Sequence, residues 1–240
     1  MMTLRPARAR GHADHGWLRT WHAFSFADYF DPRHMGWGNL RVLNEDIVAP
    51  GTGFGMHGHR DMEIVTWVLR GALTHRDSLG HAATIRPGEV QRMSAGRGVR
   101  HSEVNEGAEP VHLLQIWVLP RQHDLEPAYE QRAVDAALLD GRLLPVVAPA
   151  EGGTPAAVAG WSPLRWQADA TLRVGRLDGA QRLVHALAPA RLGYLHVARG
   201  RLRVNGTPLE AGDAVLLRDE AAVELTGGQQ AEVLLFDLAP

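Results

Sequence analysis

The sequence predicts an all-β protein with two β-barrel or jelly-roll domains in one chain and few short helices. Three observations support this fold class. Apolar segments are short and recur about every 8–12 residues between turn signals, as in sandwiches and barrels. Gly 26 and Pro 14 among 240 residues make the chain rich in turns. The second half repeats the order of strands and turns in the first half, which indicates a duplicated domain.

Five segments in the first half have the composition of strands. Most are rich in β-branched or aromatic residues, and glycine or proline bounds or breaks each of them. They are "NLRVLNEDIVAP" (39–50), "EIVTWVLRG" (63–71), "ALTHRDSLG" (72–80), "AATIRPGEV" (82–90) and "VHLLQIWVLP" (111–120). Short strands at this spacing predict a barrel or sandwich for the first domain.

Residues 121–141 form the most polar stretch and are interpreted as the connection between the domains. Within it, "VDAALLDG" is the best helix candidate, with Gly141 as its stop. We therefore expect an N-terminal domain over residues 1–135 and a C-terminal domain over residues 136–240.

Two pairs of metal-ligating side chains occur in the first half. "GFGMHGH" places His57 and His59 two residues apart, and "RHSE" does the same for His101 and Glu103. Side chains two apart on a strand share a face and lie about 6.5–7 Å apart along it. Three imidazoles and a carboxylate could then surround one ion, and this donor set suits Fe(II), Mn, Ni, Co, Cu or Zn. Glycines around the pairs would permit close backbone approach: Gly51, Gly53, Gly55, Gly58, Gly96 and Gly98.

The second half lacks these ligands at the matching positions. "TWVLRGAL" aligns with "LHVARGRL", and "RPGEV" aligns with "EAGDAV". The first match places Ala186 and Ala188 opposite the first histidine pair. The second match places Leu225 and Gly227 opposite the His-x-Glu pair. The sequence therefore predicts one metal ion, in the first domain alone.

Composition excludes several kinds of chemistry. The chain has no Cys, and all 25 basic residues are Arg, so thiol, disulfide and lysine Schiff-base chemistry are absent. A net charge of −2 gives no reason to expect nucleic acid or a membrane surface as a partner. No apolar run approaches the roughly 20 residues of a membrane span. The basic N-terminus has no apolar stretch after it, so we expect a cytoplasmic protein and no secretory signal. We also expect a monomer.

The segments around the ligand pairs resemble a known family. "GFGMHGHRDMEIVTWVLRG" resembles cupin motif 1, and "GEVQRMSAGRGVRHSEVN" resembles cupin motif 2. "HAFSFADYFDP", "HRDSLG" and "VQRMSAGRGVRHSE" are closer still to the pirin family, specifically the bacterial pirin-like bicupins with quercetin 2,3-dioxygenase activity. The resemblance is strong over about residues 20–135 and continues more weakly through "QADATLRVGRL" and "VNGTPLEAGDAV".

The resemblance implies a bicupin enzyme whose first barrel binds one divalent transition metal, Fe(II) being the first expectation. His57, His59, His101 and Glu103 would be the ligands, and the second barrel would be degenerate. The partners would be dioxygen and a small aromatic substrate, a flavonol such as quercetin bound through its 3-hydroxyl group. Dioxygen would add, the central ring would open and carbon monoxide would leave. Glu103 would accept the 3-hydroxyl proton.

Three points stay open in the sequence. General cupins use a glutamate shortly after H-x-H, where Glu63 stands, but the paired spacing favours Glu103 as the ligand. We assign Glu63 to an outer coordination sphere or a structural hydrogen bond. The protein could instead be a metal-containing binding or regulatory protein, since eukaryotic pirins are linked to transcriptional co-regulation. It could also act on another enediol or phenol, because a fold does not fix the substrate.

Other histidines and aromatic residues are weaker candidates. One group could orient ligands, although surface or hydrogen-bonded strand positions are the simpler interpretation: His34, His75, His81 and His112. Another could stack on an aromatic substrate, although core filling or a lid is the simpler interpretation: Phe24, Phe26, Phe30 and Trp37.

Overall fold

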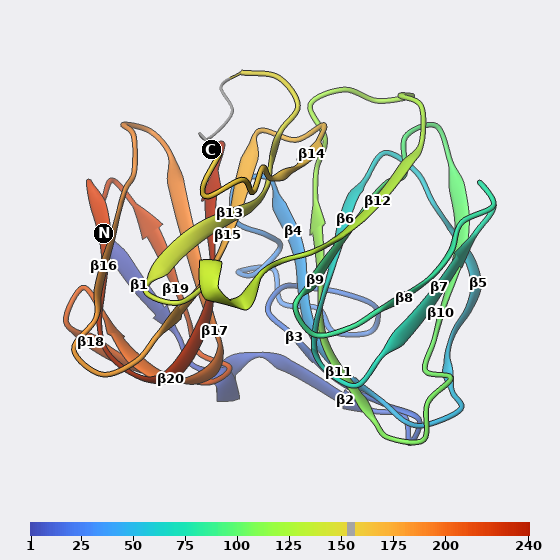
Figure 1. Cartoon of the computed structure of the whole chain (residues 1–240), viewed down its shortest axis with the longest axis horizontal. Helices are drawn as coiled ribbons and strands as arrows, with labels where there is room; N and C mark the ends of the chain where they lie inside the picture. Colours follow the sequence, from blue (N-terminus) through green and yellow to red (C-terminus); the bar gives the residue numbers. More distant parts are fainter. Residues whose placement is uncertain (153–156) are drawn as a thin grey trace.

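The computed structural model describes residues 1–152 and 157–240. It shows two β-barrels side by side, the first drawn in blue to green and the second in yellow to red apart from the blue β1 (Figure 1). The helices in the described residues are single 3-10 turns, η1 (Ala7–Ala9) and η2 (Ala136–Leu138). The predicted all-β fold with two barrels and few short helices is confirmed. No helix in the described part is long and apolar enough to cross a membrane.

The first barrel combines a seven-stranded and a four-stranded sheet. The larger sheet has the order β12 (Ala128–Ala133), β9 (Glu89–Ser94), β6 (Glu63–Arg70), β11 (Val111–Val118), β4 (Leu40–Val48), β3 (Leu18–His22), β2 (Gly11–Asp14). The smaller sheet has the order β5 (Gly53–His59), β10 (Val99–Val104), β7 (Leu73–Asp77), β8 (Ala82–Ile85). All five predicted strand segments contain strands.

The second barrel is one nine-stranded sheet. Its main path is β1 (Met2–Arg5), β19 (Ala214–Arg218), β17 (Leu192–Val204), β20 (Ala222–Leu238), β15 (Ala170–Leu177), β13 (Arg142–Pro149), β14 (Leu164–Trp166). Off this path, β16 (Arg182–Ala186) pairs with β20 and β18 (Thr207–Glu210) pairs with β17. The N-terminal strand β1 thus lies in the second barrel. The division between residues 135 and 136 stays a prediction.

The connection between the barrels is more ordered than its polarity suggests. Residues 128–133 of this segment form β12, which extends the first barrel by pairing with β9. The expected helix is only the turn η2. Asp135 caps the start of this turn, since its Oδ1 accepts a hydrogen bond from the Ala137 N–H. It ends early because Leu139 is buried between the barrels and its carbonyl accepts the Arg176 N–H of β15.

The largest apolar cluster lies between the barrels, outside the interior of either one. On β6, Val65 and Trp67 belong to this cluster, whereas Val68 belongs to a cluster inside the first barrel. The alternation of a strand explains this division, since successive side chains point to opposite faces. The opposite side of the cluster comes from the second barrel, with Leu172, Tyr194, Leu234 and Phe236 among its members. Burial of this layer joins the two barrels.

We predict that Leu114→Ala lowers the free energy of unfolding by about 2–5 kcal/mol, because Leu114 is fully buried in the interbarrel cluster. Urea denaturation followed by circular dichroism measures the change. The control is Leu4→Ala on β1, where the side chain is 43% exposed and the change should stay within about 0.5 kcal/mol. Equal losses in the two variants would contradict a stabilising layer at this position.

Candidate metal centre

The predicted ligands lie on two neighbouring strands of the four-stranded sheet, β5 and β10. β10 is the middle strand, with β5 on one side and β7 on the other. His101 lies directly opposite His57 on β5, and Glu103 lies opposite His75 on β7. The two pairs therefore lie on adjacent, hydrogen-bonded strands.

A register shift between His101 and Glu103 interrupts the pairing with β5. The shift brings Gly53 against the β10 backbone, where a Cβ atom would lie 2.3 Å from the Glu103 carbonyl oxygen. Only glycine fits this close approach. Gly53 thus fulfils the role expected of the flanking glycines, whereas a Cβ on Gly55 would meet open space.

Three histidine rings converge at this place. The centroid distances are 4.5 Å for His57–His101 and 4.8 Å for both His57–His59 and His59–His101. Their ligand nitrogens lie within 4.8 Å of one another. Glu103 belongs to an overlapping group with His75 and His101, at the same limit. The chain therefore contains a metal-binding His/Glu group, with His101 shared by both sets.

The free ring nitrogens fit a bound cation. His101 Nε2 is buried and has no hydrogen-bond partner in the described part of the chain. His57 Nδ1 lies 2.7 Å from the Gly55 carbonyl oxygen, so it donates there and leaves Nε2 as the lone-pair atom. A buried nitrogen without a partner is costly unless a ligand satisfies it. The residues present thus fit a divalent transition metal.

A chain of hydrogen bonds leads from His101 towards the surface. His101 Nδ1 lies 3.3 Å from His75 Nδ1, and His75 Nε2 lies 3.0 Å from Asp77 Oδ2. Asp77 Oδ2 also lies 3.0 Å from Nδ1 of the half-exposed His81. A neutral His75 that donates to Asp77 accepts from His101 Nδ1–H. This tautomer leaves the His101 Nε2 lone pair free for an ion.

Burial sets the protonation of the site. It lowers the pKa of His59 to about 4 and that of His101 to about 3, with the neighbouring His57 acting in the same direction. Burial raises the pKa of Glu103 to about 7, against hydrogen bonds from Thr66 Oγ1 at 3.2 Å and Gln115 Nε2 at 2.7 Å. Neutral imidazoles are the form that binds metal ions.

A cavity of ≈ 400 Å³ opens onto His57, His59 and Glu103. Aromatic rings form much of its lining, with Trp17 edge-on to Phe54 at 5.2 Å and Phe26 edge-on to Trp117 at 5.3 Å. The polar lining consists of Asn44, Asp46, His57, His59, Glu103 and Gln115. The volume and the mixture of aromatic and polar groups suit a small aromatic ligand.

His75 and most of the aromatic lining are not evident as site residues from the sequence. His75 is fully buried beside His101, and it contributes to the second ligand group. Of the proposed stacking residues Phe26 lines the cavity, whereas Phe24 lies in the interbarrel cluster and Phe30 is 71% exposed. Trp37 packs against the same cluster.

The remaining candidates lie away from the cavity. Glu63 Oε2 accepts a hydrogen bond from Ser94 Oγ at 2.7 Å and has a further partner in the Gln167 backbone of the second barrel. Glu63 thus makes structural hydrogen bonds. His112 Nε2 bonds Glu45 at 2.8 Å. His34 lies in the loop between β3 and β4.

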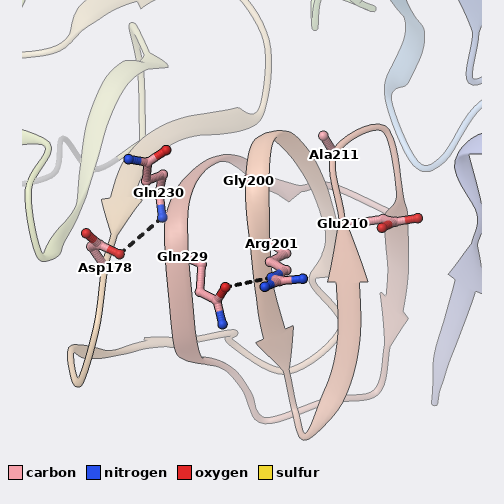
Figure 2. Close-up of a pocket in the computed structure, with 7 residues that line it drawn as sticks. All are labelled: Asp178, Gly200, Arg201, Glu210, Ala211, Gln229 and Gln230. Atoms are coloured by element: carbon pink, nitrogen blue, oxygen red, sulfur yellow. Dashed lines mark hydrogen bonds between the residues drawn. The ribbon is translucent and has the colours of Figure 1, made fainter.

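The second barrel differs from the first in its possible metal ligands. Within residues 1–152 and 157–240, the groups of three or more possible ligands are the two described above, both in the first barrel. β16 pairs with β20 there, and Leu225 of that pair is buried in the apolar interior. A separate open hollow of ≈ 720 Å³ lies on this barrel (Figure 2). Two hydrogen bonds join residues of its lining, one from Arg201 to Gln229 and one from the Gln230 N–H to Asp178.

The fold and this site together define a two-barrel protein of the cupin type with a metal-binding His/Glu group. A family model described as Pirin matches residues 3–118, and one described as Quercetinase C-terminal cupin domain matches residues 160–238. The quercetin 2,3-dioxygenase of Escherichia coli strain K12 is 42% identical over 241 residues, with 100% of both chains covered. The chain belongs to the pirin family, as its sequence motifs predict.

Two further relatives extend this result. A pirin-like protein of Caulobacter vibrioides is 40% identical over 239 residues, with 100% of both chains covered. The crystal structure of the bacterial pirin YhhW from Escherichia coli in complex with nickel(II) has a TM-score of 0.91 and 41% identity. It also covers 100% of both chains. A metal ion is thus found in a relative that shares the whole fold.

We predict that Glu103→Gln loses most of the metal, because a neutral amide is a weaker ligand than a carboxylate. Glu63→Gln should retain the parent's metal content, since Glu63 bonds Ser94 and the second barrel instead. Metal analysis after dialysis against a weak chelator separates the two variants. A larger loss of metal from Glu63→Gln than from Glu103→Gln would show that Glu63 is the ligand.

Asp77→Asn should lower metal affinity by about 10–100-fold, the usual effect of removing an outer carboxylate, because Asp77 orients His75 and His75 in turn orients the proposed ligand His101. The amide would lose the charge that accepts from both His75 and His81. Competition with a chromophoric chelator measures the affinity. The matched control is Glu106→Gln, an exposed carboxylate paired with Arg76, which should leave affinity unchanged. Equal affinity in Asp77→Asn and the parent would show that His75 needs no such partner.

Proposed function

We propose that the protein is a metal-dependent dioxygenase that opens the central ring of a flavonol such as quercetin and releases carbon monoxide. The observation that carries the proposal is the aromatic cavity that ends at the converged histidines. The names of its relatives support the same activity, since the Escherichia coli protein that matches the full chain is a quercetin 2,3-dioxygenase.

The proposed ligands are His57, His59, His101 and Glu103, and the proposed ion is one divalent transition metal. Fe(II) is our first expectation, and the nickel complex of a relative supports nickel as the main alternative. The bound ion would supply Lewis acidity to the chelating oxygen atoms of the substrate and a site for dioxygen chemistry. We further propose that the second barrel binds no metal, since it offers no comparable ligand group within its described residues.

The residues of the cavity would bind and orient the substrate. Trp17, Phe26, Phe54 and Trp117 form the aromatic part of the lining, so flat rings can pack among them. Glu103 would accept the 3-hydroxyl proton, because it lines the cavity beside His57 and His59. Gln115 Nε2 and Thr66 Oγ1 lie at hydrogen-bond distance from the Glu103 carboxylate and fix its orientation.

The metal-loaded protein should consume oxygen with quercetin and release carbon monoxide. Glu103→Gln should lower kcat per bound metal by about 10²–10⁴-fold, since an amide cannot accept the proton. An oxygen electrode and a carbon monoxide assay measure both gases.

Two controls accompany this experiment. The apoprotein must be inactive, and a flavonoid without the 3-hydroxyl group should not react, because it offers no acidic proton at the chelating position. Oxygen uptake no faster than with free metal would overturn the dioxygenase proposal for this substrate. A binding or regulatory role would then be the better account of the same cavity.

A further inference from the structure

A second buried carboxyl group lies in the same cavity as Glu103. Asp46 on β4 lines the cavity and is 3% exposed. Its Oδ1 has no hydrogen-bond partner among the described residues, and no ion pair to it occurs there. Thr20, directly opposite on β3, is close enough for its side chain to lower the pKa of Asp46, but its buried Oγ1 makes no hydrogen bond of normal geometry. A buried carboxyl group in this state needs an explanation, since desolvation without a partner is costly.

Asp46 differs from Gln115 and from the other polar side chains of β4, because each of those has a hydrogen-bond partner. Asn44 Oδ1 pairs with His22 Nδ1 at 2.8 Å, and Gln115 Nε2 pairs with Glu103 at 2.7 Å. Glu45, the next residue along β4, faces away and pairs with Arg10 and with His112. Strand alternation places Asn44 and Asp46 together on the cavity side. Burial raises the pKa of Asp46 to about 7, and the Thr20 side chain opposes this rise only in part.

We propose that Asp46 binds a hydroxyl group of the aromatic ligand, other than the one at the metal, and selects for hydroxylated rings. This inference rests on the proposed function, which places a flavonol in the cavity. A hydroxyl group both donates and accepts, so it can satisfy either form of the carboxyl group. A ring carbon carrying only hydrogen at the same place would leave Asp46 buried without a partner. Sites built to bond a hydroxyl discriminate strongly against analogues that lack it.

Anaerobic titrations of the metal-loaded protein test this selection, with quenching of tryptophan fluorescence as the signal. The two probes are quercetin and 3-hydroxyflavone, which share the chelating 3-hydroxyl group but differ in their other ring hydroxyls. Wild type should prefer quercetin by about tenfold or more, the usual effect of one hydrogen bond to a charged group. Asp46→Leu should reduce this preference by at least about tenfold, because leucine has a similar size and no polar atom.

Further variants keep the test decisive. Asp46→Asn preserves shape, so it replaces the leucine variant if that one does not fold, and it should reduce the preference by about threefold or more. Asp14→Asn removes an exposed carboxylate on β2 and should keep the wild-type preference. Circular dichroism and metal content must match the parent in each variant compared.

The outcomes separate the two proposals, because the titrations need no turnover. An unchanged preference in the folded Asp46 variants overturns the role of Asp46. Equal binding of both probes by wild type, or binding of neither, overturns it too. A preference that depends on Asp46 without oxygen uptake supports Asp46 and overturns the dioxygenase. Oxygen uptake together with a preference that does not depend on Asp46 supports the dioxygenase and overturns the role of Asp46.

Discussion

The pairing register of β6 with β11 is the constraint on which both the fold and the site depend. Trp67 lies opposite Leu114, and Thr66 lies opposite Gln115. The first pair faces outward and builds the apolar layer between the barrels. The second pair faces inward and holds the Glu103 carboxylate. A slip of one residue would exchange the two faces, burying polar groups between the barrels and removing the partners of Glu103.

The interbarrel layer lets the interior of the first barrel remain partly polar. The second barrel is filled by one continuous apolar cluster that includes Leu195, Val215 and Leu225. The first barrel has two smaller clusters inside, one around Ile85 and one around Met93. The cavity draws on both clusters, because Trp17 and Phe54 pack against one and Trp117 packs against the other. A shared outer layer thus supplies burial that the hollow barrel lacks inside.

Much of this arrangement is predictable from local pattern. Strand alternation and turn residues predict the strands of the first barrel, and the two-residue spacing predicts that His57, His59 and His101 converge. Long-range pairing is beyond such patterns. Glu63 stands close to the H-x-H motif in sequence, yet β6 directs it to Ser94 and the second barrel. His75 reaches the site because β7 pairs with β10. A polar residue such as Gln115 inside an apolar strand was the available signal for the cavity.

The cavity lies between two sheets that carry different chemistry. The histidines and Glu103 come from β5 and β10 of the four-stranded sheet, whereas Asn44 and Asp46 come from β4 of the seven-stranded sheet. A ligand that contacts the polar groups of both sheets needs oxygen atoms at more than one place. Between these oxygen atoms it needs an apolar part that can pack among the aromatic rings. A simple hydrocarbon would leave the Asp46 carboxyl group without a partner, and a small enediol would leave the aromatic rings uncovered. The geometry therefore favours a polyhydroxylated aromatic compound over either of these simpler classes.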